Sequence, residues 1–222
     1  MTMSQQEPRR ARTAKAKSAR RIQILDAAHK LAKAGADPST ISMADVARMA
    51  GVAKGTPYLY FRTKEELFLG LLEAGLEDWF DALDASLAGG SGWVPAAGLA
   101  DLVTDSLASR PLLRRLLAQL GPVIERNLDS DRVLRFRWRV AGRLATTGSL
   151  LERRTVFLRP GDGPRLLLRL EALAMGIQSL AEPAAPVRSV LEAPGLEAFR
   201  LDFAADFRAA TKAWLTGLER TN

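Results

Sequence analysis

The sequence has 222 residues, no cysteine and a single histidine, His29. Without cysteine the chain cannot form disulfides, thiolate zinc sites, iron–sulfur clusters or a cysteine nucleophile. One histidine excludes multi-histidine metal sites, and a Ser-His-Asp triad would have to use His29, which we expect to be structural or solvent-facing. No stretch approaches the roughly 18 apolar residues of a membrane span, and the basic N-terminus leads into no signal-type apolar segment. We therefore expect a cytoplasmic protein with no catalytic centre, metal, cofactor or membrane contact.

Positive charge is in excess. Lys+Arg number 32 against 25 Asp+Glu, which gives a net charge of +7 and favours a polyanionic partner, with nucleic acid first. Residues 1–21 carry seven basic side chains and one acid, so a charge of +6 lies there and the remainder is nearly neutral. Residues 1–19 have almost nothing to bury and are expected to form a flexible basic arm, either solvated or in contact with DNA. The hydrophobic content of 47% supports a packed core in the rest of the chain.

Residues 20–66 contain three predicted helices. The second should begin at Ser42, whose side chain can form a capping box with Asp45, and Gly51 can supply the positive φ of a sharp reversal after it. Two short helices joined by a tight glycine turn are typical of a helix-turn-helix, although an ordinary helical hairpin is the alternative. The three helices are expected from Arg20 to Gly35, from Ser42 to about Ala50 and over residues 53–61.

Only helices are predicted downstream, with no convincing strand. A second capping box, of Thr63 with Glu66, opens a long helix that the glycines of residues 89–92 should end. The fold class is therefore all-α: an N-terminal three-helix helix-turn-helix domain followed by a larger helical domain. The last helix carries an aromatic stripe from Phe199 to Trp214, which is expected to pack in the core of the domain. The further helices are expected over residues 95–109, as a short pair within 111–127, and over 130–156, 163–181 and 195–219.

The second helix of a helix-turn-helix lies in the major groove of double-stranded DNA, with its N-terminal residues at base edges. Lys54 can donate to guanine, Thr56 can offer a hydroxyl or a methyl group to a base, and Gly55 permits close approach of the backbone. Donors near helix ends suit phosphate oxygens, which position a protein without reading sequence. These positioning residues are Ser42, Tyr58, Tyr60 and Lys64. Phe61 is expected in the core because it cannot share a helix face with its neighbour Tyr60.

Residues Ile24 to Ala28, Gly35 and the run VARMAGVAKGTPYLYFRTKEEL from Val46 to Leu67 resemble the DNA-binding domain of TetR-type transcriptional regulators. The chain departs from that pattern at two positions. Pro57 stands where the family usually has leucine or isoleucine, and it lacks an N–H, so it should be tolerated only near the first turn of the helix. Ala53 stands where the family usually has a serine cap, so the recognition helix should be less well capped until DNA phosphates approach.

The resemblance implies a DNA-binding domain over residues 20–66 and an all-helical effector-binding and dimerisation domain over 67–222, the latter loosely similar to the AefR-like subgroup. It also implies a homodimeric repressor of a palindromic operator, with the last two helices of each subunit forming a four-helix interface and a small-molecule effector releasing the DNA. The DNA-contact roles that carry over fall on Ser42, Ala44, Lys54, Gly55, Thr56, Tyr58, Tyr60 and Lys64.

Trp79, Trp138 and Gln178 lie on three downstream predicted helices and could line an effector pocket, with core packing as the alternative for both tryptophans. Two other classes of function stay open. One is a helical enzyme with an accessory DNA-binding domain, against which stands the absence of a phosphate loop, an HExxH motif, a nucleophile elbow and a histidine pair. The other is a nucleic-acid-packaging protein that binds through charge alone, which a dependence on base-edge residues would exclude.

Overall fold

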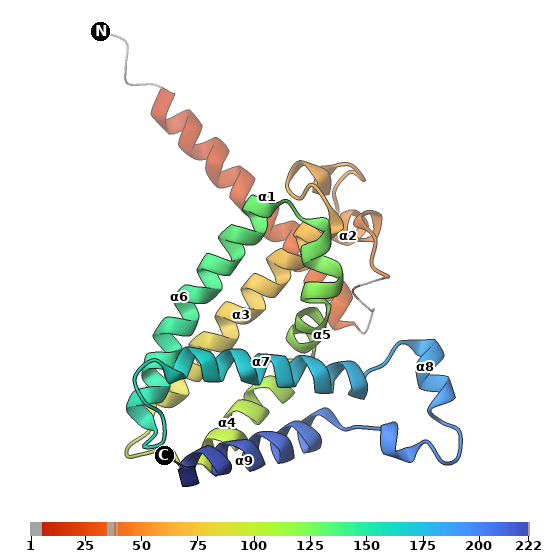
Figure 1. Ribbon diagram of the computed structural model, residues 1–222. Helices are drawn as coiled ribbons and strands as arrows, with labels where there is room; N and C mark the ends of the chain where they lie inside the picture. Colours follow the sequence, from red (N-terminus) through yellow and green to blue (C-terminus); the bar gives the residue numbers. More distant parts are fainter. Residues whose placement is uncertain (1–5, 35–37, 39, 222) are drawn as a thin grey trace.

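The computed structural model describes residues 6–34, 38 and 40–221, with side chains from residue 15 onward (Figure 1). The described residues contain helices and no strand, which confirms the all-α prediction. The N-terminal part consists of α1 (Gln6–Lys33), α2 (Met43–Ala50) and the 3-10 turn η1 (Thr56–Leu59), and α3 (Lys64–Gly89) follows it. The larger helical part consists of α4 (Ala96–Ala108), α5 (Pro111–Gln119), the π turn η2 (Leu120–Ile124), the 3-10 turn η3 (Glu125–Asn127), α6 (Ser130–Arg154), α7 (Asp162–Ala181), α8 (Ala185–Val190), the 3-10 turn η4 (Glu197–Phe199) and α9 (Phe203–Thr221).

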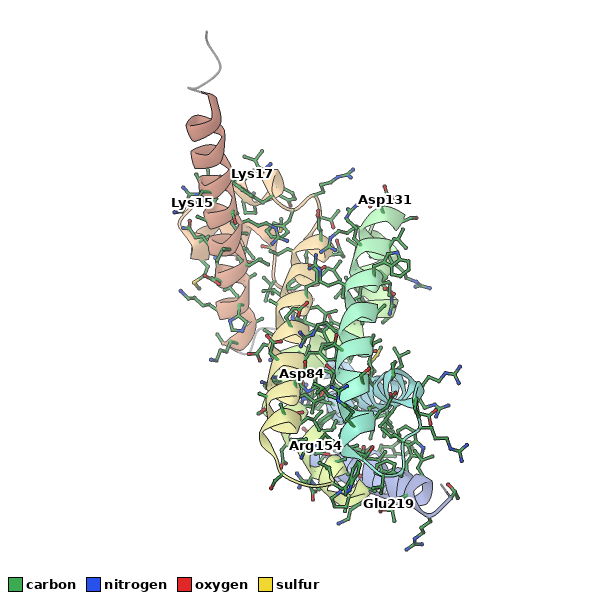
Figure 2. All side chains as sticks on the ribbon, turned by 90° about the vertical axis from the view of Figure 1, so that its left-hand side faces the viewer. Lys15, Lys17, Asp84, Asp131, Arg154 and Glu219 are labelled. Atoms are coloured by element: carbon green, nitrogen blue, oxygen red, sulfur yellow. The ribbon has the colours of Figure 1, made fainter. Side chains whose placement is uncertain are left out.

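The basic N-terminal segment differs from its prediction as a flexible arm. Residues 6–19 continue α1 toward the N-terminus, and this half of the helix projects away from the rest of the molecule (Figure 1). Alanine, arginine, lysine and glutamine all have high helix propensity, and Pro8 lies in the first turn, where its missing N–H costs nothing. Lys15 and Lys17 lie on this projecting part and are exposed (Figure 2). The remainder of the predicted arm, residues 1–5, lies outside the described residues, as do Gly35 and Asp37.

The N-terminal part has a small core of its own, built where α1 crosses α2. Ile24 and Ala28 of α1 and Val46 of α2 are fully buried, and Phe61 after η1 joins them, as the sequence predicted. The guanidinium of Arg21 lies 4.8 Å from the centroid of the Phe61 ring. This cluster holds α1 and α2 in a fixed relation, so the two helices form one base for the turn that follows.

Helix α3 runs continuously from the N-terminal part into the larger one. Its first turns bury Leu67 and Leu72 against the helix-turn-helix, and its later turns bury Phe80 and Leu83 in the second core. A bidentate ion pair ties its middle to α6: Arg132 Nη1 and Nη2 donate to Glu73 Oε1 and Oε2 at 2.9 and 2.7 Å, with both side chains buried. One helix therefore contributes to both cores.

Near the C-terminus one predicted helix starts later than expected, and one short helix was not predicted. The last helix was expected from residue 195 but α9 starts at Phe203, because Asp202 Oδ1 accepts a hydrogen bond from the Ala205 N–H at 2.8 Å and so caps the helix there. Phe199, the first member of the predicted core stripe, is consequently 57% exposed, whereas Phe203 and Phe207 are buried and stacked. The short helix α8 was not predicted, since the prolines near it indicated only a loop.

Helices α6 and α7 cross at two glycines. A Cβ atom on Gly148 would lie 2.6 Å from the backbone nitrogen of Pro164, and a Cβ atom on Gly163 would collide with the backbone of Gly148. Glu152 Oε1 accepts hydrogen bonds from the N–H groups of Gly161 and Gly163 at 2.9 and 2.8 Å, so it satisfies the start of α7 at the same place. The two backbones are in direct contact at this crossing.

We expect Gly163→Ala to lower the free energy of unfolding by about 1–3 kcal/mol, because its methyl group meets backbone that cannot move aside. The matched control is Gly142→Ala in α6, where a Cβ atom would meet nothing within 4 Å. This control should raise stability by about 0.5–1 kcal/mol through helix propensity. Urea unfolding of the two variants measures the difference, and equal stability of both would contradict the tight crossing.

Candidate nucleic-acid interface

The start of α2 is fixed by the predicted capping box. The Ser42 hydroxyl accepts a hydrogen bond from the Asp45 N–H at 3.2 Å, and Asp45 Oδ2 accepts from the Ser42 N–H at 3.2 Å. The Ser42 hydroxyl also donates to Asp45 Oδ2 at 2.5 Å. These bonds from the side chain and backbone of Ser42 lower the pKa of Asp45. Both donors of Ser42 are thus engaged within the cap, so a phosphate contact by Ser42 would have to share or replace one of these bonds.

The turn after α2 has the glycine geometry that the sequence predicted. Gly51 adopts φ 66° and ψ 36°, the left-handed region, and its N–H bonds back to the end of α2. Gln23 Nε2 of α1 donates to the Ala50 carbonyl oxygen at 2.7 Å, which satisfies another terminal carbonyl of α2. The chain is therefore turned sharply and held against α1 just before residues 53–61. We call these residues, which were predicted as the recognition helix, the reading segment.

The reading segment is shorter and more tightly wound than predicted. An α-helix was expected over residues 53–61, but the structure has a 3-10 turn at Thr56–Leu59. Pro57 lies within its first two residues and is buried, and Ala53 provides no side-chain cap. A short segment that contains proline and lacks a cap forms few i to i+4 bonds, which favours the 3-10 geometry. The Tyr60 N–H donates to the Pro57 carbonyl at 3.0 Å in the i to i+3 pattern.

The predicted DNA-contact residues lie on the surface of this unit, along the start of α2, the reading segment and the start of α3. Tyr58 is 54% exposed, so its hydroxyl is free of the core. The ammonium of Lys64 lies 5.6 Å from the centroid of the Phe68 ring, which places the side chain of Lys64 along α3. Ser42, Lys54, Gly55 and Tyr58 are exposed, and Ala44, Thr56, Tyr60 and Lys64 are half-buried.

Leu59 belongs to this surface and was missed. It is 75% exposed within η1, although leucine is normally a core residue. A signal for it was present, because Leu59 precedes the buried Phe61 by two residues and so faces away from it on a helical turn. An exposed leucine beside Lys54 and Thr56 offers an apolar surface of the kind that contacts a thymine methyl group.

The start of α3 is capped differently from the predicted box. Thr63 Oγ1 accepts from the Glu66 N–H at 3.1 Å as expected, but Glu66 Oε2 accepts from the Arg62 N–H at 2.7 Å. The Glu66 carboxylate thus ties down the residue before the cap. The reading segment is fastened to α3 at this point, so a displacement of α3 moves the reading segment with it.

Besides the backbone of α3, Arg62 and Arg115 make polar contacts that connect the N-terminal part to the larger helical part. Arg62 Nη1 lies 3.6 Å from Asp129 Oδ2 at the start of α6, and both side chains are exposed. Arg115 Nη2 of α5 donates to the Ala32 carbonyl oxygen at the end of α1, at 3.4 Å. Glu182 after α7 lies 4.0 Å from Arg115 Nε. We call the N-terminal part up to the first turn of α3 the DNA-facing unit, because it carries the predicted DNA contacts. The start of α6 and the end of α7 are thereby linked to this unit.

Of the three predicted pocket residues, only Trp79 lines an interior cavity. This cavity lies between α3, α4, α5, α6 and α7, and with a volume of about 20 Å³ it has room for about one water molecule. Trp79 Nε1 donates to Ser106 Oγ at 2.9 Å. Gln178 is buried but lies outside the cavity lining, and Trp138 is 71% exposed because its face of α6 points to solvent.

The cavity wall is apolar except for Arg137 and Glu171, which the sequence did not single out. Burial raises the pKa of Glu171, while the nearby guanidinium of Arg137 acts in the opposite direction. The remaining lining residues are Leu76, Trp79, Phe80, Leu107, Leu117, Phe136, Val140, Leu144, Leu167, Leu170 and Ala174.

Two family models match the chain. "Bacterial regulatory proteins, tetR family" covers residues 24–71, and "Tetracyclin repressor-like, C-terminal domain" covers residues 73–222, more than half of the chain. The chain belongs to the TetR family. As a TetR-family protein it is a transcriptional regulator that binds DNA through its helix-turn-helix.

A curated relative and two solved structures are similar to this chain. The uncharacterized HTH-type transcriptional regulator YfiR of Bacillus subtilis is 34% identical over 91 residues, 41% of this chain and 44% of that protein. The match therefore spans less than half of either protein. A candidate TetR-family regulator from Mesorhizobium loti has a TM-score of 0.52 at 17% identity, over 92% of this chain and 97% of the other, so the likeness is one of fold. A candidate regulator from Streptomyces coelicolor has a TM-score of 0.45 at 23% identity, over 87% and 97% of the two chains.

Within the described residues no helix is long and apolar enough to cross a membrane. In the same part of the chain no group of three or more histidine, cysteine, aspartate or glutamate side chains is arranged to hold a metal ion.

We expect Ser42→Ala to cost about 1 kcal/mol of unfolding free energy, because it removes the cap of α2. The cap holds Asp45 with a lowered pKa, so its stabilisation is present above the ordinary carboxyl range and is lost as pH falls through the folded-state pKa. The difference in free energy of unfolding between the unsubstituted protein and Ser42→Ala should therefore become smaller as the pH is lowered from 7 to about 3. Ser86→Ala, at an exposed serine within α3, is the matched control. A gap independent of pH would contradict the Ser42–Asp45 coupling.

Proposed function

We propose that this TetR-family protein is a repressor that binds a palindromic operator as a homodimer and is released by a small-molecule effector. The observation that carries the proposal is the continuity of α3. The reading segment is fastened to its first turn by Thr63 and Glu66, and Trp79 and Phe80 near its middle line the interior cavity. A change in the cavity therefore acts on the same helix that positions the reading segment.

Reading of DNA sequence rests on Lys54, Gly55 and Thr56, with Leu59 as an apolar addition. Lys54 and Gly55 are exposed and Thr56 is half-buried in the segment that follows α2, which supports the roles given to them by the family pattern. Tyr58, Tyr60 and Lys64 would hold phosphates on either side, with Ser42 and Ala44 at the start of α2. Lys15, Lys17 and Arg20 on the projecting half of α1 add exposed positive charge that acts on any DNA sequence.

The dimer interface is assigned to the outward faces of α7 and α9. Leu168 and Leu180 of α7 are 45% and 54% exposed, an unusual amount for leucines on a helix that also contributes to the core. A shallow hollow of about 390 Å³ lies between α7 and α9 and is lined by Arg169, Leu173, Ala210 and Trp214. A two-fold partner would cover this surface with the same surface of its own.

Effector release follows from how full the cavity is. At about 20 Å³ it cannot hold a small molecule, so an effector binds only a conformer in which the surrounding helices have separated. Such a ligand binds the two conformers with different affinity, which is the requirement for shifting their populations. The opened conformer would displace α3 and spoil the separation of about 34 Å that two recognition segments need in successive major grooves.

The DNA-reading part is tested on operator fragments selected from the source organism's genomic DNA. Lys54→Ala should weaken operator binding by about 1–3 kcal/mol and relax specificity, while binding to random DNA changes little. The paired change Lys15→Ala/Lys17→Ala should weaken binding to both DNAs and flatten the salt dependence. Lys212→Ala, an exposed lysine of α9, is the control. Equal losses on operator and random DNA for both sets would favour charge-driven packaging and overturn the proposal.

The effector part is tested by tryptophan fluorescence across a panel of apolar small molecules. A true effector should change the Trp79 signal, because the indole is buried in the cavity wall, and should release the operator at the same concentration. The fluorescence response should vanish in Trp79→Phe and persist in Trp138→Phe, whose ring lies in solvent. A releasing ligand whose response survives Trp79→Phe would place the effector site elsewhere.

A further inference from the structure

The connection between α7 and α9 is the least integrated part of the molecule. We call residues 182–202 the α8 segment; it carries α8 and η4 and projects beyond the ends of α7 and α9 (Figure 1). Neither α8 nor η4 buries a residue. Val187, Val190 and Phe199 are 49%, 61% and 57% exposed, so this segment shows three large apolar side chains to solvent.

The α8 segment is nevertheless held in shape by its own hydrogen bonds. Arg200 Nε donates to the Leu191 carbonyl oxygen at 2.7 Å, and Arg200 Nη2 donates to that of Ala193 at 3.4 Å. Arg188 Nη2 donates to the Pro183 carbonyl at 3.2 Å. Preformed backbone geometry without a core of its own is suited to binding another surface, since little conformational entropy is lost when it binds.

A surface of complementary character lies at the opposite end of α7. We call residues 153–169 the α6–α7 corner; they contain five arginines and one acid, against four acids and two arginines in the α8 segment. Arg153, Arg159, Arg165 and Arg169 are exposed, and none of them forms an ion pair within the described residues. The corner also exposes Val156, at 63%, and Leu168.

Within one chain these two surfaces cannot meet. They lie at the two ends of α7, whose 20 residues span about 30 Å. In a two-fold dimer that pairs α7 with α7 about an axis perpendicular to these helices, the two helices run antiparallel, so the C-terminal end of one lies beside the N-terminal end of the other. Two copies therefore bring each α8 segment to the α6–α7 corner of its partner.

We propose that the α8 segment is a clamp that docks on the α6–α7 corner of a second copy of this chain, with its apolar side chains against Val156 and Leu168 and with Glu192 and Glu197 toward the unpaired arginines. This inference rests on the dimer proposed above and adds a contact in trans that extends its α7 face from Leu168 toward Val156. The positive corner and negative segment fit each other in charge, and both expose apolar side chains that the monomer leaves uncovered.

The apolar part is tested with Val190→Ser/Phe199→Ser in the full chain, with the dimer dissociation constant measured by sedimentation. We expect it to rise about tenfold or more, because each side chain is lost from both symmetric contacts. Leu134→Ser, an exposed leucine of α6 with similar accessibility, should change it less than twofold. A dimer unaffected by the double substitution overturns the clamp and leaves the α7 and α9 interface standing. A chain that sediments as a monomer at micromolar concentration overturns both.

The electrostatic part is tested by charge exchange. Glu192→Lys/Glu197→Lys and Arg159→Glu/Arg165→Glu should each weaken the dimer by a factor of about 3–10, and all four changes together should recover most of the loss. Additive losses in the fourfold variant contradict the pairing.

The contact in trans is tested by cross-linking, for which a chain without cysteine is convenient. Glu197→Cys/Arg165→Cys with a short bis-maleimide should give covalent dimers, and neither single substitution should do so efficiently. Cross-links confined to one chain, or none in a chain that sediments as a dimer, overturn the clamp.

Discussion

One uninterrupted helix is the constraint on which the other features of the molecule depend. Helix α3 carries no proline and buries residues in both cores, so the N-terminal part and the larger part share one backbone ladder without a flexible connection. Near its middle the bidentate Glu73–Arg132 pair fixes its relation to α6. Arg139 Nη1 also lies 3.2 Å from Glu73 Oε1. Removing Glu73 would leave the buried charge of Arg132 unpaired, so the pair specifies the register of the two helices more than it adds to their stability.

The polar contacts around α3 are of two kinds, short ones within the N-terminal part and weak ones between the two parts of the molecule. The caps at Ser42 and Thr63 and the left-handed Gly51 are local and hold the DNA-facing unit as one body. The links from that unit to the larger helical part, Arg62–Asp129 and Arg115 to the Ala32 carbonyl, are long or exposed and therefore weak. Rotation of the unit against the larger helical part would cost little at these links, whereas deformation of the unit itself would break several short bonds.

Local chemistry explains which features could be predicted from the sequence. The Ser42 cap, the Gly51 turn, the Phe61 core position and the long helix after Thr63 each depend on residues within four positions of one another, and each is present. The predictions that failed depend on longer-range balance. Periodicity cannot tell an α-helix from a 3-10 turn around Pro57, and it cannot place Trp138, which is exposed because α6 turns that face away from the core. The start of α9 was missed although Asp202 signals it, because the aromatic spacing extended one step too far toward Phe199.

The glycine crossing of α6 and α7 restricts how the cavity between these helices can open. The backbones touch at Gly148 and Gly163, and Glu152 binds the start of α7 there, so this end of the pair cannot separate. The two helices can therefore separate only by rotating against each other about this crossing point, and the displacement is largest at the ends farthest from it. Those ends are the start of α6, next to Arg62, and the end of α7, next to Arg115. Gly148 and Gly163 thus fix the point about which the two helices move, and the displacement is largest where the larger helical part contacts the DNA-facing unit.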